Sequence, residues 1–159
     1  MLFRSHDSVM VVVDTLTKAA HFIPVKSTFG TAQVVNVFLK EVVRLHGFPK
    51  VIVSDRDAKF TADFWKGLFG GMGTKLNFST AYHPQIDGQT ERTNQILEDM
   101  LRMYVMDRPS QWEDYLHLAK FAYNNSFQSS IQMSPFEALY GRKCRTPLSW
   151  KIGRASCRE

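Results

Sequence analysis

The stretch SVMVVVDTLTKAAHFIPV, residues 8–25, contains two apolar runs separated by a short polar segment. The first run, SVMVVVDTLT, is continuous and rich in valine, which is typical of a central strand buried on both faces of a sheet. The second run, AAHFIPV, indicates another short strand, and Pro24 marks an edge or an end because proline cannot donate to a sheet ladder. The stretch therefore predicts two consecutive strands.

The residues that follow show helical and strand-like patterns in turn. Apolar residues recur at helical spacing between Thr31 and His46, and Gly47 is placed to end that helix. Ser134-Pro135-Phe136-Glu137 is a capping box with proline at the first helical position. The other predicted strands are a buried one at 50–55 and one at 74–80. The other predicted helices lie at 61–73, where the helix fails at Gly70-Gly71, and at 88–105, 112–123 and 135–140. This order predicts a mixed α/β layer fold.

The composition narrows the class of protein. The chain has 159 residues, of which 44% are hydrophobic and 13% aromatic, so it is long and apolar enough for one globular domain with a real core. No apolar run approaches the roughly 18 residues of a membrane span, and no signal peptide is recognisable. The two cysteines lack metal-ligand spacing, which favours a reducing compartment. The net charge of +5 fits a polyanion partner and an ordinary basic domain equally well.

We interpret residues 1–150 as one domain and residues 151–159 as a separate tail. The segment IGRASCRE, residues 152–159, follows no periodic pattern and resembles the conceptual translation of a sequencing adapter, so we expect it to be non-native. The alternative, an ordinary disordered C-terminus, stays open.

Two carboxylates stand at positions that suit chemistry. Asp55 follows the end of an apolar strand, where α/β folds tend to place ligand-binding groups. Glu91 lies near the start of a polar helix face, with 35 residues between the two. Carboxylates from different elements can converge on a hard cation such as Mg²⁺. Taken singly, each is more often a turn residue or a partner of the helix dipole.

The sequence motifs around these two acids favour metal binding over a role as turn residues or partners of the helix dipole. VSDRDAKFTADFW at 53–65 and AYHPQIDGQTERTNQ at 81–95, with VVVDTLTKAAHFIPV, EVVRLHGFPKVIVSDRD and YNNSFQSSIQMSPFEALYGRKCRTPL in the same order, resemble the integrase catalytic core of gypsy-class long-terminal-repeat retrotransposons and retroviruses. The resemblance covers nearly the whole chain. It implies a ribonuclease H-like fold with a mixed central sheet, and a site of three acids that binds two Mg²⁺ or Mn²⁺ ions for 3′-end processing and strand transfer.

By this resemblance, Asp55 is the second acid and Glu91 the third. The family's first acid lies on a strand upstream of the run matched here by DSVMVVVD, and MLFRS does not match that strand. Asp14 and Asp7 match aspartates that are not metal ligands in the pattern, so we expect structural roles for both. The resemblance therefore implies a core whose first strand is missing or incomplete, truncated at its N-terminus, with little or no strand transfer.

Further residues are assigned to DNA by the same resemblance. We expect a flexible loop over the site, hinged at Gly88, in which Tyr82, Gln85, Asp87 and Gln89 contact the end of the donor DNA. Asn94 lies one turn after Glu91 and would contact DNA or support the glutamate. Arg56 and Lys59 flank Asp55 and suit phosphate binding or simple solvation. His83 has no second histidine or cysteine at ligand spacing, so we do not expect a zinc site.

The leading hypothesis is a metal-dependent DNA-integrating domain of a retrotransposon polyprotein. Its expected partners are the element's DNA ends and target DNA, and no membrane. We expect a homodimer or higher oligomer, and a parent element that passes from a virus-like particle to the nucleus. One alternative is a non-catalytic ribonuclease H-like module that binds nucleic acid or self-associates. Another is a ribonuclease H-like nuclease acting on RNA–DNA hybrids. The loop-and-helix sequence of residues 79–95 argues against this second alternative.

Overall fold

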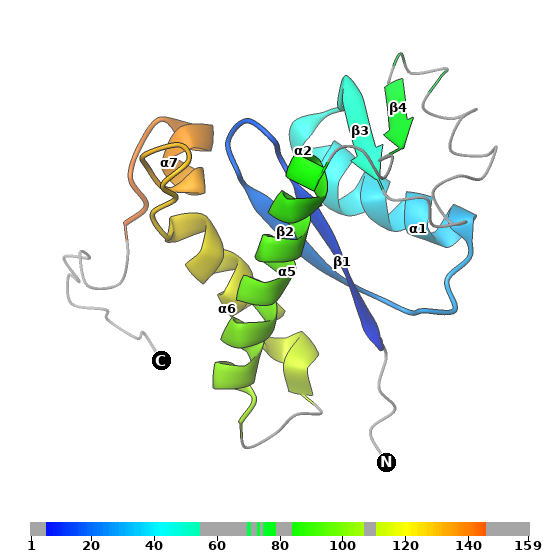
Figure 1. Ribbon diagram of the computed structural model, residues 1–159. Helices are drawn as coiled ribbons and strands as arrows, with labels where there is room; N and C mark the ends of the chain where they lie inside the picture. Colours follow the sequence, from blue (N-terminus) through cyan, green and yellow to red (C-terminus); the bar gives the residue numbers. More distant parts are fainter. Residues whose placement is uncertain are drawn as a thin grey trace, which may run out of the picture.

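The computed structural model describes residues 6–54, 70, 73, 75–78, 84–106 and 111–145 (Figure 1). Its strands are β1 (Ser8–Val13), β2 (Ala20–Val25), β3 (Val51–Ser54) and β4 (Lys75–Phe78). Its helices are α1 (Thr31–Phe38), η1 (Leu39–Val43), α2 (Arg44–His46), α5 (Pro84–Tyr104), α6 (Trp112–Asn125) and α7 (Pro135–Tyr140). No described helix is long and apolar enough to cross a membrane.

Strands β1 and β2 form an antiparallel hairpin with Val13 opposite Ala20. The Asp14 carboxylate closes the turn by accepting hydrogen bonds from the backbone N–H and the hydroxyl of Thr17, at 2.9 and 2.6 Å. At the other end of the hairpin, the Asp7 carboxylate accepts from the backbone N–H and the hydroxyl of Ser27, both at 2.6 Å. The structural roles that we expected for these two aspartates are therefore confirmed.

Strands β3 and β4 run parallel, with Val51 opposite Lys75 and Ser54 opposite Phe78. Among the described residues, no ladder joins this pair to the hairpin, so the strands form two separate two-stranded sheets. Each described sheet therefore has one kind of pairing, and the single mixed central sheet that we expected is not formed by the described strands.

Two cores lie on opposite faces of the hairpin. Figure 1 shows the helices that cover them, α1 to one side of the hairpin and α5 and α6 to the other. On one face, Ile23 and Val25 of β2 pack with α1 and η1. On the other, Ala20 and Phe22 pack with Leu97 of α5 and with residues of α6. Successive strand residues point to opposite faces, so the apolar run of β2 supplies both cores.

The helix predicted from Thr31 to His46 is confirmed as one helical stretch, built from α1, η1 and α2. Of its predicted apolar stripe, Val34, Val35, Phe38 and Val42 are buried and Leu39 is half-buried, whereas Leu45 is exposed. Leu39–Val43 is a π-helical turn within it, a form that α-helices contain as single-turn bulges. Gly47 ends the stretch with φ at +76°, a conformation that favours glycine.

The predicted helices at the C-terminal side are also confirmed. The hydroxyl of Ser134 accepts a hydrogen bond from the Glu137 backbone N–H at 3.2 Å, which caps the start of α7. Gly141 ends α7 in the left-handed conformation, with φ at +69°. Helix α6 runs to Asn125, two residues beyond the predicted end.

Three sequence-based expectations are corrected. Every residue of β1 is half-buried or exposed, whereas β2 is the more buried strand. Both strands contribute to both cores, but only β2 contributes buried side chains. Strand β3 is likewise not fully buried, since Val51 is exposed. Helix α5 begins at Pro84 rather than near Gly88. The family resemblance suggested a loop there, but proline suits the first turn of a helix.

Candidate functional site

The predicted acidic site belongs to the parallel pair of strands and to helix α5. Asp55 is the residue that follows β3, and it lies outside the described residues. Arg56, Lys59 and Tyr82 also lie outside them, as do His83 and most of the predicted helix at 61–73. The role proposed for Asp55 therefore stays a prediction.

Glu91 lies in the first half of α5, one helical turn before Asn94 and Gln95. Asn94 and Gln95 are exposed, whereas Thr93 is 2% exposed and Leu97 is buried. The Thr93 and Tyr123 hydroxyls lie 3.3 Å apart, which fixes α5 against α6. The predicted polar face of α5 thus faces solvent in the part of the helix whose side chains are described.

Gln85, Asp87 and Gln89 all lie within α5. The predicted flexible loop hinged at Gly88 is therefore wrong for these positions, because the helix already begins at Pro84. Their predicted contacts with DNA, like that of Asn94, are untested by the fold. No group of three or more histidine, cysteine or acidic side chains that could hold a metal ion occurs among the described residues.

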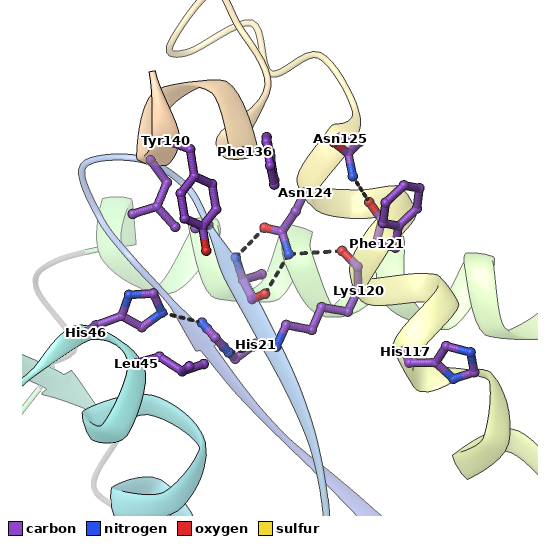
Figure 2. A pocket seen from close by; sticks show the side chains of 13 residues that line it. His21, Leu45, His46, His117, Lys120, Phe121, Asn124, Asn125, Phe136 and Tyr140 are labelled. Carbon is purple, nitrogen blue, oxygen red and sulfur yellow. Dashed lines mark hydrogen bonds between the residues drawn. The ribbon is translucent and has the colours of Figure 1, made fainter. Parts of the chain in front are cut away.

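A second polar cluster, which sequence reasoning missed, joins β2, α2 and α6. The Nε2 atoms of His21 and His46 lie 2.9 Å apart, and the Lys120 Nζ atom lies 2.9 Å from His21 Nδ1 (Figure 2). A charged ammonium can only donate, so we assign His21 as the neutral tautomer that accepts at Nδ1 and donates from Nε2 to His46. We call these three residues the His–His–Lys cluster.

Burial sets the protonation of this cluster. His21 is 8% exposed, and burial, followed by the charges of Lys120 and His46, lowers its pKa to about 4. Burial also lowers the pKa of Lys120, against a raising effect of the Glu41 carboxylate on η1. His21 is therefore neutral at physiological pH. The only sign of this cluster in the sequence was a histidine within an apolar strand. Such a histidine is usually a hydrogen-bonded core residue.

Asn124 closes the outer edge of β2 beside this cluster. Its Oδ1 accepts from the Ala20 backbone N–H, and its Nδ2 donates to the Ala20 carbonyl, both at 2.9 Å. The amide thus takes the place of a neighbouring strand at that residue. Lys120 and Asn124 are one turn apart on α6, so one face of this helix covers the edge of β2.

Comparison with known proteins gives relatives of two kinds, although no family model matches the chain. The Tf2-3 transposon polyprotein of Schizosaccharomyces pombe is 37% identical over 135 residues. That match covers 85% of this chain and 10% of the polyprotein, so the chain spans about a tenth of the length of the curated relatives it matches.

Two solved structures show the same fold. The HTLV-2 integrase catalytic core domain in complex with magnesium matches with a TM-score of 0.67 and 20% identity, covering 82% of each chain, and it is known in trimeric and dimeric forms. The simian T-cell lymphotropic virus intasome, in complex with the PP2A regulatory subunit B56 gamma, matches with a TM-score of 0.72 and 20% identity, covering 93% of this chain and 51% of that one.

The fold is therefore that of the retroviral integrase catalytic cores, a ribonuclease H-like α/β architecture. The 37% sequence identity to the transposon polyprotein indicates common ancestry in addition to a common fold. The chain is homologous to a segment of the Tf2 retrotransposon polyproteins, and its fold is similar to that of retroviral integrase catalytic cores. The family resemblance stated from the sequence is confirmed.

Proposed function

We propose that this domain acts on DNA, within a longer polyprotein, in the metal-dependent processing and joining of the element's ends. The observation that carries this proposal is the 37% identity to a transposon polyprotein over 135 residues that also adopt an integrase core fold. The position of Glu91 on α5, one turn before exposed residues, supports it, since a metal ligand needs access to substrate. The nucleus is the compartment in which such a reaction would meet target DNA.

Asp55 and Glu91 would hold the cation. Their donor chemistry fits a hard divalent ion, because both offer carboxylate oxygens, and the HTLV-2 relative was solved with magnesium. When bound, Mg²⁺ or Mn²⁺ would polarise the phosphate and lower the pKa of an attacking water or hydroxyl. In this proposal Asn94 and the polar residues Gln85, Asp87 and Gln89 orient DNA, together with Tyr82, Arg56 and Lys59.

We further propose that neither Asp7 nor Asp14 serves as a third metal-binding carboxylate, so that residues 1–159 by themselves would show little or no strand transfer. Asp7 and Asp14 are the acids at the two ends of β1, and both are already occupied by hydrogen bonds with Ser27 and Thr17. Burial raises the pKa of Asp14, but the hydrogen bonds from Thr17 and Leu16 and the charge of His46 together outweigh it, so the net pKa is lowered. Neither acid is offered to a metal site.

The alternative is a non-catalytic module that binds nucleic acid or self-associates. It is favoured by the hydrogen bonds that occupy the Asp7 and Asp14 carboxylates. Self-association is supported by the dimeric and trimeric forms of the HTLV-2 relative. The aromatic-rich helix α6 is the expected contact, and its residues Leu118 and Phe121 are exposed. Sedimentation of the purified chain over a range of concentrations would distinguish a monomer from an oligomer.

The decisive experiment measures metal binding and DNA joining together. Mg²⁺ or Mn²⁺ should raise the thermal midpoint of the chain, and Asp55→Asn and Glu91→Gln should each remove that rise, whereas Asp114→Asn on α6 should not. Extending the chain at its N-terminus by a strand that carries an aspartate should add DNA joining. If the unextended chain joins DNA ends and Asp14→Asn abolishes the reaction, the assignment of acids is wrong.

A further inference from the structure

Helix α7 lies beside the C-terminal end of α6 (Figure 1). The loop between these helices and the residues after α7 line a cavity of about 410 Å³, a volume within the range of ligand pockets. Phe127 and Met133 contribute apolar side chains to it, and Glu137 and Lys143 bring charges of opposite sign. None of its described lining residues belongs to the His–His–Lys cluster or to α5, which carries Glu91.

The two charged side chains of this cavity lack partners in the described part of the chain. Glu137 is half-buried in the first turn of α7, and Lys143 is exposed beyond the end of that helix. Neither side chain makes a hydrogen bond or an ion pair with a described residue, so the two charges lie beyond ion-pair distance from each other. A half-buried carboxylate without a donor is costly, and a ligand that brings donors to Glu137 and a negative charge to Lys143 would relieve that cost.

We propose that this cavity binds an unpaired guanine of single-stranded DNA, a class of ligand that rests on the function proposed above. The Watson–Crick edge of guanine carries two adjacent donors, N1–H and N2–H, which donate to the two oxygens of the Glu137 carboxylate. A neighbouring phosphate of the strand accepts a hydrogen bond from the Lys143 ammonium. The base thus satisfies the carboxylate, and the phosphate satisfies the cation.

The donor pattern of Glu137 selects guanine among the four bases. Adenine and cytosine place a ring nitrogen acceptor next to their amino group, and that acceptor would face a carboxylate oxygen. Thymine has one N–H between two carbonyl groups. In a duplex the guanine donors are paired with cytosine, so only an unpaired guanine offers them.

Phe127 and the cations around Lys143 argue for nucleic acid rather than for a peptide. Phe127 is 67% exposed and lines the cavity, so its ring is available for stacking on a base. Arg142 and Arg145 are exposed on either side of Lys143, which places three cations within four positions of the chain. A DNA strand brings one phosphate per nucleotide and can use all three, whereas a peptide with one carboxylate would use a single cation.

The test uses two matched trinucleotides, d(TGT) and d(TIT), in which the inosine base lacks only the N2 amino group of guanine. Their binding to the full chain is followed by NMR shifts of the backbone amides of Gln128, Glu137 and Lys143, in EDTA and without divalent metal. The guanine trinucleotide should bind about tenfold more tightly than the inosine trinucleotide, the ratio expected for one partly exposed hydrogen bond to a charged group.

Variants locate the source of that preference. Glu137→Gln keeps the shape of the side chain but turns one acceptor into a donor, so it should bind both trinucleotides equally, and Glu137→Ala should do the same if the glutamine variant fails to fold. Lys143→Met should weaken both trinucleotides by the same factor and reduce the salt dependence of binding by about one charge. Glu41→Gln and Lys40→Met change exposed residues of η1 outside this cavity and should leave both affinities unchanged. Each variant's NMR spectrum reports whether it is folded.

Four results would overturn the proposal. The first is equal binding of the two trinucleotides by the wild-type chain, and the second is the absence of shifts at the limit of solubility. The third is shifts confined to amides of α5, which would place the bound strand elsewhere. The fourth is the dipeptide N-acetyl-Lys-Glu-amide shifting the same amides at lower concentration, which would assign the cavity to a protein segment. These readouts need no metal ion, so a failure here leaves the proposed joining reaction standing, and a failure of DNA joining would not change them.

Discussion

Protonation of His21 should make this domain lose stability in mildly acidic solution. The imidazole is buried and neutral in the folded chain, with its pKa lowered from 6.5 to about 4. Above about pH 6.5 neither the folded nor the unfolded state is protonated, so the full stability is present. As the pH falls towards about 4 the unfolded state takes up the proton first, and the free energy of unfolding decreases.

The magnitude follows from the two pKa values. Each unit of pKa difference corresponds to about 1.4 kcal/mol, so the largest possible loss is about 3 kcal/mol. Between about pH 7.5 and about pH 5 the loss attributable to His21 is about 2 kcal/mol. The groups that face His21 are Lys120 from α6 and His46 from α2, with the carboxylates of Asp14 and Glu41 acting on His46 and on Lys120 respectively.

Urea denaturation of the wild-type chain and of His21→Gln at the two pH values measures this loss. Glutamine offers an acceptor for Lys120 and a donor for His46 but does not titrate, so the variant should lose about 2 kcal/mol less than wild type. His117→Gln, which removes an exposed imidazole from α6, is the control and should behave like wild type. If wild type and His21→Gln lose the same free energy, the buried neutral state of His21 is refuted.

Three further predictions concern packing and caps, each measured as a free energy of unfolding in urea. Asn124→Ala leaves the Ala20 peptide groups without partners and should cost about 2 kcal/mol, whereas Asn125→Ala, which breaks one bond within its own helix, should cost about 0.5 kcal/mol. Equal losses would contradict the edge-closing role. Ala119→Leu overfills a fully buried site and should cost about 2 kcal/mol; a neutral effect would indicate free space there. Ser134→Ala removes a helix cap and should cost about 1 kcal/mol, and no loss would show that the cap is dispensable.

The elements that the sequence predicted well are those whose signals are local. The apolar stripe from Val34 to Leu45 predicted a helix. It is buried as far as Val42, because a helix buries one face by its own periodicity, but Leu45 at its end is exposed. The start of α7 follows from the chemistry of Ser134 with its neighbours, which needs no tertiary contact. The overall fold, in contrast to these local elements, was predicted from the family resemblance, which rests on sequence motifs spread along the chain.

The features that sequence reasoning missed depend on contacts between distant residues. His21 and His46 are 25 positions apart, and Lys120 is 99 positions from His21, so no window of sequence contains the cluster. The burial of β1 was overestimated for a related reason. A valine-rich run shows that a strand is apolar, but which of two adjacent strands is covered on both faces depends on where the helices pack.

The closed edge of β2 limits where a further strand could join the hairpin. Asn124 occupies both peptide groups of Ala20, and Pro24 has no N–H to offer, so a further strand cannot pair along the outer edge of β2. The side of β1 away from β2 has no such cover among the described residues. A further strand that joined the hairpin would therefore pair with β1, on the side away from β2.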